Sequence, residues 1–437
     1  MMFLSGPVKV DNDLSLAISR MQQNFGAYLK RAFTNAHVRR ADVDTGAPHV
    51  ILDKTFFQDK NSDVMIKNLR TIKSESPRML SIQAEMLQDI LTLSVDLGAL
   101  SLECEYEMIN HDVMKLLPVS SDGILNATIE STRAEGRVGY RITGDSLQAI
   151  NFDVEYKMGR IHLQATYSEG GQKMHSQSTR ESIDETILKG VRRDFERYFE
   201  DQLREQLNNV LQDVSLTQMF DEDDDLVKKY ALRGLSRSTA ANNLVDMFLV
   251  QIRKFISDWG YSQIDIEDLR KSFRYPFDSF SIFWGSFEAT EGTARNLSTI
   301  YRTGDFSIHH EQNQMVIFGS LGLNELACNY ESYRAKVWNI GPSGKISATT
   351  GHNSVKLRIV STGWITSIEN AADKIIDLDF KVERIDDIKV SITGLWILNN
   401  LASTFISWIA ALFNSSIIVL VEDTIKQQMR QFLSLKS

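Results

Sequence analysis

Two regions of the chain place apolar residues at three- and four-residue spacing, the pattern of an amphipathic helix. In the first region these residues are Leu14, Ile18, Met21, Phe25, Tyr28, Ala32 and Phe33. In the second they are Leu244, Phe248, Ile252, Phe255 and Trp259. Gly260 follows where the second helix should end. Each region therefore predicts a helix with one apolar face.

Period-two alternation of apolar and polar residues predicts antiparallel strands after each helix. One series is Leu91, Leu93, Val95 and Leu97, and beyond Gly98 the phase flips to Leu100, Leu102, Cys104, Tyr106 and Met108. A phase slip beside glycine predicts a β-bulge that bends a long strand. Two further series are Phe152, Val154, Tyr156 and Met158, and Ile376, Leu378, Phe380 and Val382. Such one-sided strands are typical of an antiparallel sheet with one covered face, and strand–helix–strand alternation is missing.

A long helix is predicted to follow each set of strands. The first carries the apolar series Ile183, Ile187, Val191, Phe195, Tyr198, Leu203, Leu207 and Val210, with charged residues on the other face. The second is residues 395–421, LWILNNLASTFISWIAALFNSSIIVLV, which contain no charged side chain. At about 1.5 Å per residue, a helix of that length could cross a hydrocarbon layer of about 30 Å.

Short similarities recur along the chain at a nearly constant offset, which indicates an internal repeat. The matched pairs are residues 68–72 with 296–300, 123–128 with 344–349, 153–161 with 377–385, and 200–207 with 422–429. We interpret them as two copies of one unit, residues 1–219 and 237–437, joined by an acidic linker, residues 220–236. The repeat aligns residues 395–421 with the charged helix of the first copy, so we expect a helix inside the second unit and not a membrane anchor.

Composition narrows the possible partners. The net charge of −9 and the isoelectric point near 5.5 argue against a nucleic-acid partner, which would need a basic face. The only cysteines, Cys104 and Cys328, allow one bridge at most. We expect both to be small buried apolar residues, the alternative being a bridge between the two units.

The sequence offers no recognisable catalytic motif. It lacks G-x-S-x-G, G-x-G-x-x-G, P-loop and H-E-x-x-H patterns. His309 and His310 are adjacent in a strand-like segment, so their side chains should point to opposite faces and not share a metal ion. We expect both at the surface. The chain is accordingly predicted to have no catalytic residues, no metal site and no cofactor.

A family resemblance is carried by residues 295–300 and 302–305, by residues 321–323 ahead of Tyr330, and by the run from 399 to 429. With the repeat, these resemble the tubular lipid-binding (TULIP) superfamily, in particular mite group 7 allergens and insect juvenile-hormone-binding and takeout-like proteins. The resemblance implies an α+β fold of two tandem units. In each, a highly curved antiparallel sheet wraps a long C-terminal helix, an amphipathic helix stands at the N-terminus, and an apolar tunnel holds a lipid-like ligand. No cysteine pair lies near either N-terminal helix, which favours the allergen-like branch and not juvenile hormone itself as ligand.

The candidate tunnel-lining residues are apolar positions on the predicted helices and strands, and for each the alternative is ordinary core packing. They are Phe25, Phe33, Leu100, Leu102, Ile183, Val191, Phe195, Phe199, Phe248, Phe255, Trp259, Trp396, Phe405, Trp408 and Phe413. We expect a non-enzymatic carrier or transfer protein for lipids or other elongated apolar molecules. The alternatives are recognition of microbial lipids or membrane surfaces, with transient membrane contact, and a structural or interaction protein whose tunnel is filled.

The first residues, MMFLSGPVKV, lack the basic start and long apolar core of a signal peptide. Either the chain is intracellular or a signal has been removed. With the family resemblance we expect an extracellular protein, and a cytoplasmic one is the alternative.

Overall fold

The computed structural model describes most of the chain. The described residues are 12–41, 49–59, 62–75, 77–110, 119–169, 172–177, 181–258, 260, 262–276, 282–311, 313–337, 341–351, 353–363, 365, 371–385 and 388–394, with Ile406, Ile409, Leu412, Ile418, Glu422, Asp423, Lys426 and Gln427.

The first half of the chain, from α1 to α3, is built on one curved antiparallel sheet. Its strands are β1 (Val50–Asp59), β2 (Ser62–Ser74), β3 (Arg78–Glu85), β4 (Ile90–Asn110), β5 (Val119–Thr143), β6 (Ser146–Met158), β7 (Ile161–Glu169) and β8 (Gln172–Gln177). The order is β1-β2-β4-β5-β7-β8, with β3 added beside β4 and β6 beside β5. The helices are α1 (Asn12–Ala41), α2 (Glu181–Gln212) and α3 (Leu216–Met219).

The second half, from α4 onward, has two antiparallel sheets. One runs β10 (Leu269–Pro276), β11 (Ile282–Arg295), β15 (Ala327–Val337), β16 (Ser343–Thr349), β19 (Lys389–Ile392), with β9 (Gln263–Ile266) beside β11. The other runs β12 (Ile300–Arg302), β14 (Gln314–Leu323), β17 (Asn353–Ser361), β18 (Ile375–Ile385), with β13 (Ser307–Glu311) beside β14. The helices are α4 (Asp224–Asp258), the 3-10 turn η2 (Leu297–Thr299) and α5 (Ala371–Lys374).

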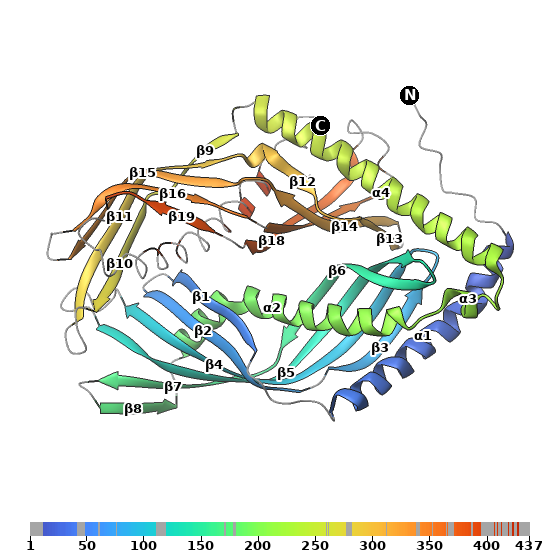
Figure 1. Ribbon diagram of the computed structural model, residues 1–437, viewed down its shortest axis with the longest axis horizontal. Coiled ribbons are helices and arrows are strands. Elements are labelled where there is room, and N and C mark those ends of the chain that lie inside the picture. Colours follow the sequence, from blue (N-terminus) through green and yellow to red (C-terminus); the bar gives the residue numbers. More distant parts are fainter. Residues whose placement is uncertain are drawn as a thin grey trace.

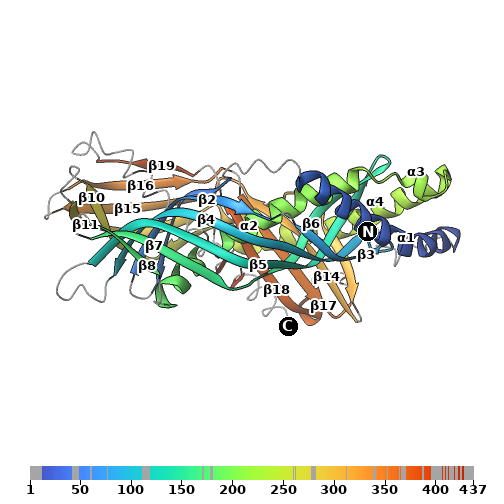
Figure 2. The ribbon, with the colours of Figure 1, turned by 90° about the horizontal axis from the view of Figure 1, so that it is seen from below.

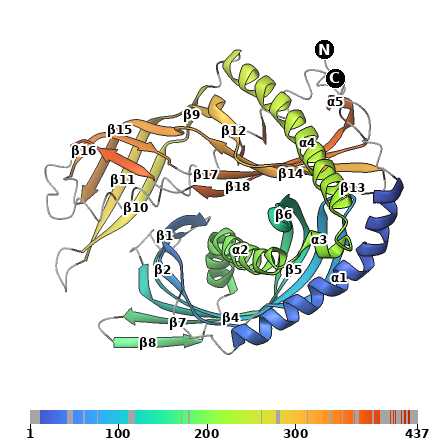
Figure 3. The ribbon, with the colours of Figure 1, turned by 45° about the vertical axis from the view of Figure 1, so that its right-hand side comes forward.

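The two halves lie against each other along much of their length (Figure 1), and the whole molecule is elongated (Figure 2). The sheet of the first half forms a trough around α2, and the strands β17 and β18 of the second half lie over the open side of that trough (Figure 3). Each half has a large apolar core, but neither core is confined to its half: Phe56 of β1 and Met65 of β2 belong to the core of the second half, and Tyr230 of α4 belongs to that of the first. A small third cluster of Ile90, Val316, Phe318 and Val360 also joins the halves. The predicted α+β class with curved antiparallel sheets and long helices is confirmed.

The segment expected to be an acidic linker is helical for most of its length. The acidic side chains of residues 221–225 are exposed, as their charge predicts, but α4 begins at Asp224. Tyr230 in its first turns is fully buried and packs into the core of the first half. The sequence did not reveal this helix because an acidic run at the start of a helix has the same composition as a solvated linker. The domain boundaries themselves stay a prediction.

The strand prediction is confirmed at its most specific point. The pairing of β4 with β5 shifts register on both sides of Gly98, whose φ of +75° suits glycine. The bend keeps both apolar series of β4 on the covered face, where all the described members are buried. Ile376 is the exception among the predicted strand residues, because it is 51% exposed and Ile375 packs against the core in its place.

The helix predictions are right in most positions. In α1 the residues Leu14, Ile18, Phe25 and Phe33 are buried, but Tyr28 is 45% exposed and Leu29 is buried instead. The helix α4 ends at Asp258 close to Gly260, which has a φ of +75° as a helix-terminating glycine should.

Candidate ligand-binding interior

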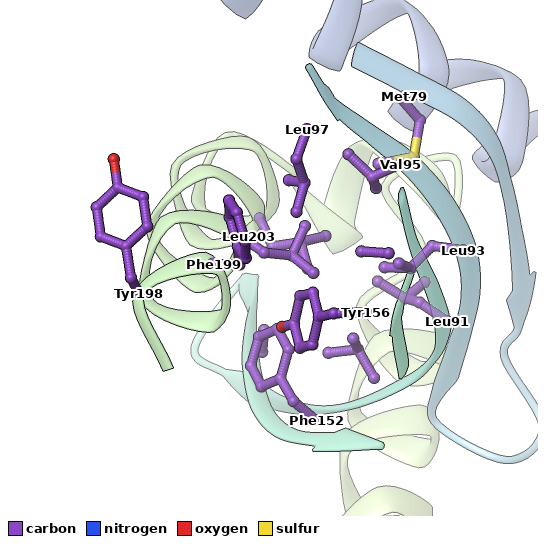
Figure 4. Packing of buried hydrophobic residues seen from close by; sticks show 14 of the residues in the cluster. Met79, Leu91, Leu93, Val95, Leu97, Phe152, Tyr156, Tyr198, Phe199 and Leu203 are labelled. Atoms are coloured by element: carbon purple, nitrogen blue, oxygen red, sulfur yellow. The ribbon is translucent and has the colours of Figure 1, made fainter. Parts of the chain in front are cut away.

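The interior of the first half is the space between α2 and the concave face of its sheet (Figure 3). The helix turns its apolar stripe into the trough because Val191, Phe195 and Phe199 recur at four-residue spacing, and all three are buried in one cluster with β4 and β6. In Figure 4, Phe199 and Leu203 of α2 point toward the side chains of the two strands, whereas Tyr198 points away from them. The sheet and the helix thus enclose a continuous apolar interior.

Most predicted lining residues of the first half belong to the same apolar core, and Phe25 and Phe33 reach it from α1, which packs against β3. Those found buried in its core are Phe25, Phe33, Leu100, Leu102, Val191, Phe195 and Phe199. Ile183 belongs to α2, but its side chain lies outside the described residues. The structure therefore brings the predicted set together, and whether these side chains touch a ligand stays a prediction.

One polar atom stands out in this apolar interior. Tyr156 on β6 stacks on Phe199, with ring centroids 6.0 Å apart, and its buried hydroxyl has no hydrogen-bond partner among the described residues. Burial raises the pKa of Tyr156 well above its ordinary range, and the neighbouring Glu200 carboxylate raises it further. The hydroxyl is therefore neutral at all physiological pH values and is a donor that a ligand oxygen or a water molecule could satisfy.

The second half has a comparable interior between α4 and its two sheets. Phe248 is buried there and Phe255 is partly buried against the same core. Phe287 and Tyr333 stack with centroids 6.1 Å apart, and the Tyr333 hydroxyl donates to the Thr393 carbonyl. Its remaining predicted lining residues, Trp259, Trp396, Phe405, Trp408 and Phe413, lie outside the described residues.

The C-terminal segment reaches this second interior. Ile409 and Leu412 are helical and fully buried in its core, and Ile418 packs against it. The described residues of the segment are all helical, as the repeat predicts for the counterpart of α2. No helix of the described residues is both long enough and apolar enough to span a membrane, although most of the uncharged stretch lies outside them.

A small cavity lies between the halves, beside Phe152 of the first core and Leu357 of the second. It measures about 30 Å³ and is lined by residues of β6, β14 and β17, including Asn151, Asp153 and Lys356. Pockets that hold drug-sized ligands usually measure roughly 300–1,000 Å³. This cavity therefore suits a water molecule, and a lipid chain would have to occupy a different space.

The open side of the first trough is closed by ion pairs that sequence analysis missed. Glu200 of α2 contacts Lys356 of β17, and Lys356 also lies 2.6 Å from Glu383 of β18. Glu196 of α2 contacts Lys381 of β18 in the same way. On α2 alone these acids belong to a charged face that looks solvated, so only the relative position of the two halves could have revealed their partners.

Two more pairs extend this inter-half seam. Arg193 of α2 lies 2.9 Å from Glu422 of the C-terminal segment, and Arg358 of β17 lies 3.3 Å from Asp153 of β6. Burial raises the pKa of Glu422 although Arg193 opposes it. Burial lowers the pKa of Lys356, but the carboxylates of Glu200 and Glu383 outweigh that effect and hold it above its usual value. Lys356 is therefore a firmly charged centre of the seam.

The described residues contain no group of three or more His, Cys, Asp or Glu side chains that could hold a metal ion. Cys104 and Cys328 are both free and buried in separate cores, which confirms the expected apolar role. The surface position expected for the two histidines is wrong for His309, which is 3% exposed because the first half covers it.

Two family models match the chain, one for each half. Residues 22–221 match the family described as haemolymph juvenile hormone binding protein. Residues 240–433 match the family described as group 7 allergen. The resemblance to the tubular lipid-binding superfamily is confirmed. The expected preference for the allergen-like branch holds for the second half, which matches the group 7 allergen family. It does not hold for the first half, which matches the hormone-binding family although it lacks the cysteine pair.

Solved structures resemble the chain only remotely. Takeout 1 of Epiphyas postvittana shares 10% identity over 39% of this chain and 82% of its own, with a TM-score of 0.27. A lipopolysaccharide binding protein shares 7% identity over 95% of this chain and 89% of its own, with a TM-score of 0.20. No curated protein sequence matches the chain.

Proposed function

We propose that this protein binds lipids or other elongated apolar molecules without catalysis and carries or transfers them. The observation that supports this most is the trough of the first half, where α2 presents a continuous apolar stripe to a curved sheet. Burying a methylene group contributes about 0.8 kcal/mol, so a chain of about a dozen methylenes could be held without charged contacts. The proposed lining is the buried set described above.

The family matches support the same function. The family matched by the first half is named for binding juvenile hormone in haemolymph, and the order of the two matches follows the order of the two halves. We infer that the chain is a tandem of two ligand-binding units and that it acts outside the cell. A cytoplasmic protein is the alternative for its location.

Extraction of the native protein provides the first test. Organic extracts of protein purified without detergent are analysed by mass spectrometry, and the delipidated protein is titrated with a fluorescent fatty acid. We expect co-purified apolar molecules and saturable probe binding. Finding neither would contradict the proposal and favour a structural protein whose interior is filled by side chains.

A larger side chain in the proposed binding interior of the first half tests where the ligand binds. Leu102 is 1% exposed on the concave face, whereas Ile124 on the neighbouring strand β5 is 44% exposed. We expect Leu102→Trp to weaken probe binding about tenfold or more, corresponding to about 1.4 kcal/mol. Ile124→Trp is the control and should bind as the unaltered protein does. Equal affinities of both variants would place the ligand outside the first trough.

Vesicle sedimentation distinguishes a carrier from a surface-recognition protein. A carrier that loads single molecules stays in the supernatant when mixed with phosphatidylcholine or anionic phosphatidylglycerol vesicles. The net charge of −9 already disfavours anionic surfaces, which attract basic faces. Pelleting of most of the protein with either vesicle would instead indicate recognition of lipid surfaces.

A further inference from the structure

The strand β13 lies in the seam where the second half meets the first. Asn151 of β6 donates hydrogen bonds to the Asp305 carbonyl (2.7 Å) and to Ser307 Oγ (2.9 Å). A Cβ atom at Gly139 of β5 would lie 2.0 Å from Ser307 Oγ, so this close approach of the two halves requires glycine. The backbone N–H of His310 donates to Gln88 Oε1 (2.6 Å) in the turn between β3 and β4. The two histidines are thus built into the contact.

His309 is buried in this seam with an unsatisfied ring nitrogen. Its side chain is 3% exposed, and among the described residues Nδ1 has no hydrogen-bond partner. The nearest carboxylate oxygen, Glu85 Oε2 on β3, is 3.6 Å from Nδ1, which is too long for a hydrogen bond. A neutral imidazole tolerates this site because burying one unpaired neutral nitrogen costs less free energy than burying a charge. An imidazolium at the same site would lose the water that stabilises its positive charge.

The charges around His309 come from both halves. From the first half it faces Glu85 on β3, Arg137 on β5 and Asp153 on β6, and on its own strand it neighbours His310 and Glu311. Arg137 and Glu311 pair at 2.8 Å, which leaves Arg137 as an anchored positive charge beside the imidazole.

His310 faces a second positive group. Arg237 of α4 is close enough to lower the pKa of His310, and the buried Nη1 atom of Arg237 has no hydrogen-bond partner in the described part of the chain. Burial is the largest cause that lowers the pKa of each histidine, followed by Arg137 for His309 and by Arg237 for His310.

We propose that the contact around β13 is an acid-sensitive latch between the two halves, which closes on neutral His309 and His310 and opens when they are protonated.

The direction of the pH effect follows from linkage. When the halves separate, the imidazoles regain water and titrate near their ordinary pKa of 6.5. Because their pKa values are lower in the closed form, the closed form binds fewer protons, and its stability falls as the pH drops below about 6.5. Asp89, near Arg237, acts in the opposite direction, because burial raises its pKa and its protonation favours the closed form. Variants of the histidine alone are therefore needed to isolate its contribution.

The test measures the distance between the halves in the full chain. Spin labels are placed on Ile124→Cys in β5 and Ile376→Cys in β18, both exposed, while the two native cysteines are buried. Pulsed electron paramagnetic resonance measures the distance between the labels at about pH 7.5 and about pH 5, on either side of the ordinary pKa of histidine. We expect one narrow distance at the higher pH. At the lower pH, about 1.5 units below the ordinary histidine pKa, the ratio of separated to closed protein should rise by up to about thirtyfold for each histidine whose pKa closure lowers.

Matched variants decide the outcome. In His309→Gln the acid-induced population should fall by half or more, whereas His162→Gln, at an exposed histidine paired with Glu130, should leave it unchanged. Glu85→Gln removes the facing carboxylate and should enlarge the separated population, which keeps the test available if His309→Gln does not fold. Distances that do not respond to pH, that shorten in acid, or that respond equally in His309→Gln would overturn the proposal.

Discussion

Leu203 and Leu232 are both leucines on long helices, but they have opposite surroundings. Leu203 of α2 is fully buried against the concave sheet, and Leu232 of α4 is 63% exposed. Truncating a buried leucine removes apolar contacts and leaves a cavity, which typically costs about 2–5 kcal/mol.

We expect Leu203→Ala to lower the free energy of unfolding by about that amount, and Leu232→Ala to change it by less than about 0.5 kcal/mol. Urea denaturation followed by circular dichroism measures both. Similar losses in the two variants would show that α2 does not pack in the trough as described.

The two cysteines give a second residue-scale prediction. Burial raises the pKa of Cys104 and of Cys328 to about 12, and neighbouring Glu103 and Glu105 add to the effect at Cys104. Only the thiolate reacts with alkylating reagents. At about pH 8, we expect no labelling of the folded protein by iodoacetamide and two labels per chain after unfolding in guanidinium. Mass spectrometry counts the labels, and rapid labelling of the folded protein would contradict the burial of these thiols.

At the residue scale, sequence periodicity predicts well which face of a helix or strand is buried, and it predicts less well which side chains make the contacts. Both Tyr28 and Leu29 follow Phe25 at helical spacing, and only the packing of α1 against β3 and α2 selects Leu29 for the core. His309 was expected at the surface because strand alternation says which face a side chain takes, and not whether another half of the chain covers that face.

At the scale of elements, ion pairs join α2 to the strands β17 and β18. Lys356 touches two carboxylates, Glu200 and Glu383, of which Glu200 is 8% exposed. Removing the cation leaves two acids facing each other in a site that water reaches poorly.

We expect Lys356→Met to lower the free energy of unfolding by about 3–5 kcal/mol near neutral pH. Lys345→Met is the control, since Lys345 pairs with Glu331 at an exposed site and such pairs contribute about 1 kcal/mol or less. Chemical denaturation measures both variants. Because protonated acids no longer repel, the loss in Lys356→Met should shrink as the pH falls. A loss that stays constant with pH would indicate a packing effect and not an electrostatic one.

The elements were predictable to different degrees for physical reasons. The bulge in β4 could be predicted because the alternation of apolar and polar residues changes phase at a glycine, Gly98. The strand order β1-β2-β4-β5-β7-β8 could not be predicted, because this alternation carries no information on which strands are neighbours. The repeat identified corresponding elements in the two halves, but it contains no information on how the halves pack together. The contacts of the seam therefore could not be predicted from the sequence.

At the scale of the whole molecule, α4 belongs to both halves. Its first turns bury Tyr230 and Arg233 against the turn between β3 and β4, and its last turns line the interior of the second half. Arg233 lies 3.0 Å from Asp89 and also donates to the carbonyls of Met86 and Leu87. Burial raises the pKa of Asp89, and Arg233 is the main group that opposes this rise.

We expect Arg233→Met to cost about 3–5 kcal/mol, because it leaves a buried carboxylate without its cation. The halves should also lose part of their coupling, so that one calorimetric transition broadens or separates into two. Arg270→Met is the control, since the Arg270 side chain is 74% exposed in its pair with Glu288. A single unshifted transition in Arg233→Met would show that this end of α4 does not hold the halves together.

The continuous helix α4 also determines how the molecule would respond to a mechanical load. Its 35 residues form a rod about 52 Å long that is anchored near one end in the first half and along the other end in the second. A flexible tether would let the halves swing in any direction, whereas a rod anchored at both ends transmits torque. Any opening of the seam should therefore require α4 to bend, to twist or to release one of its two anchors.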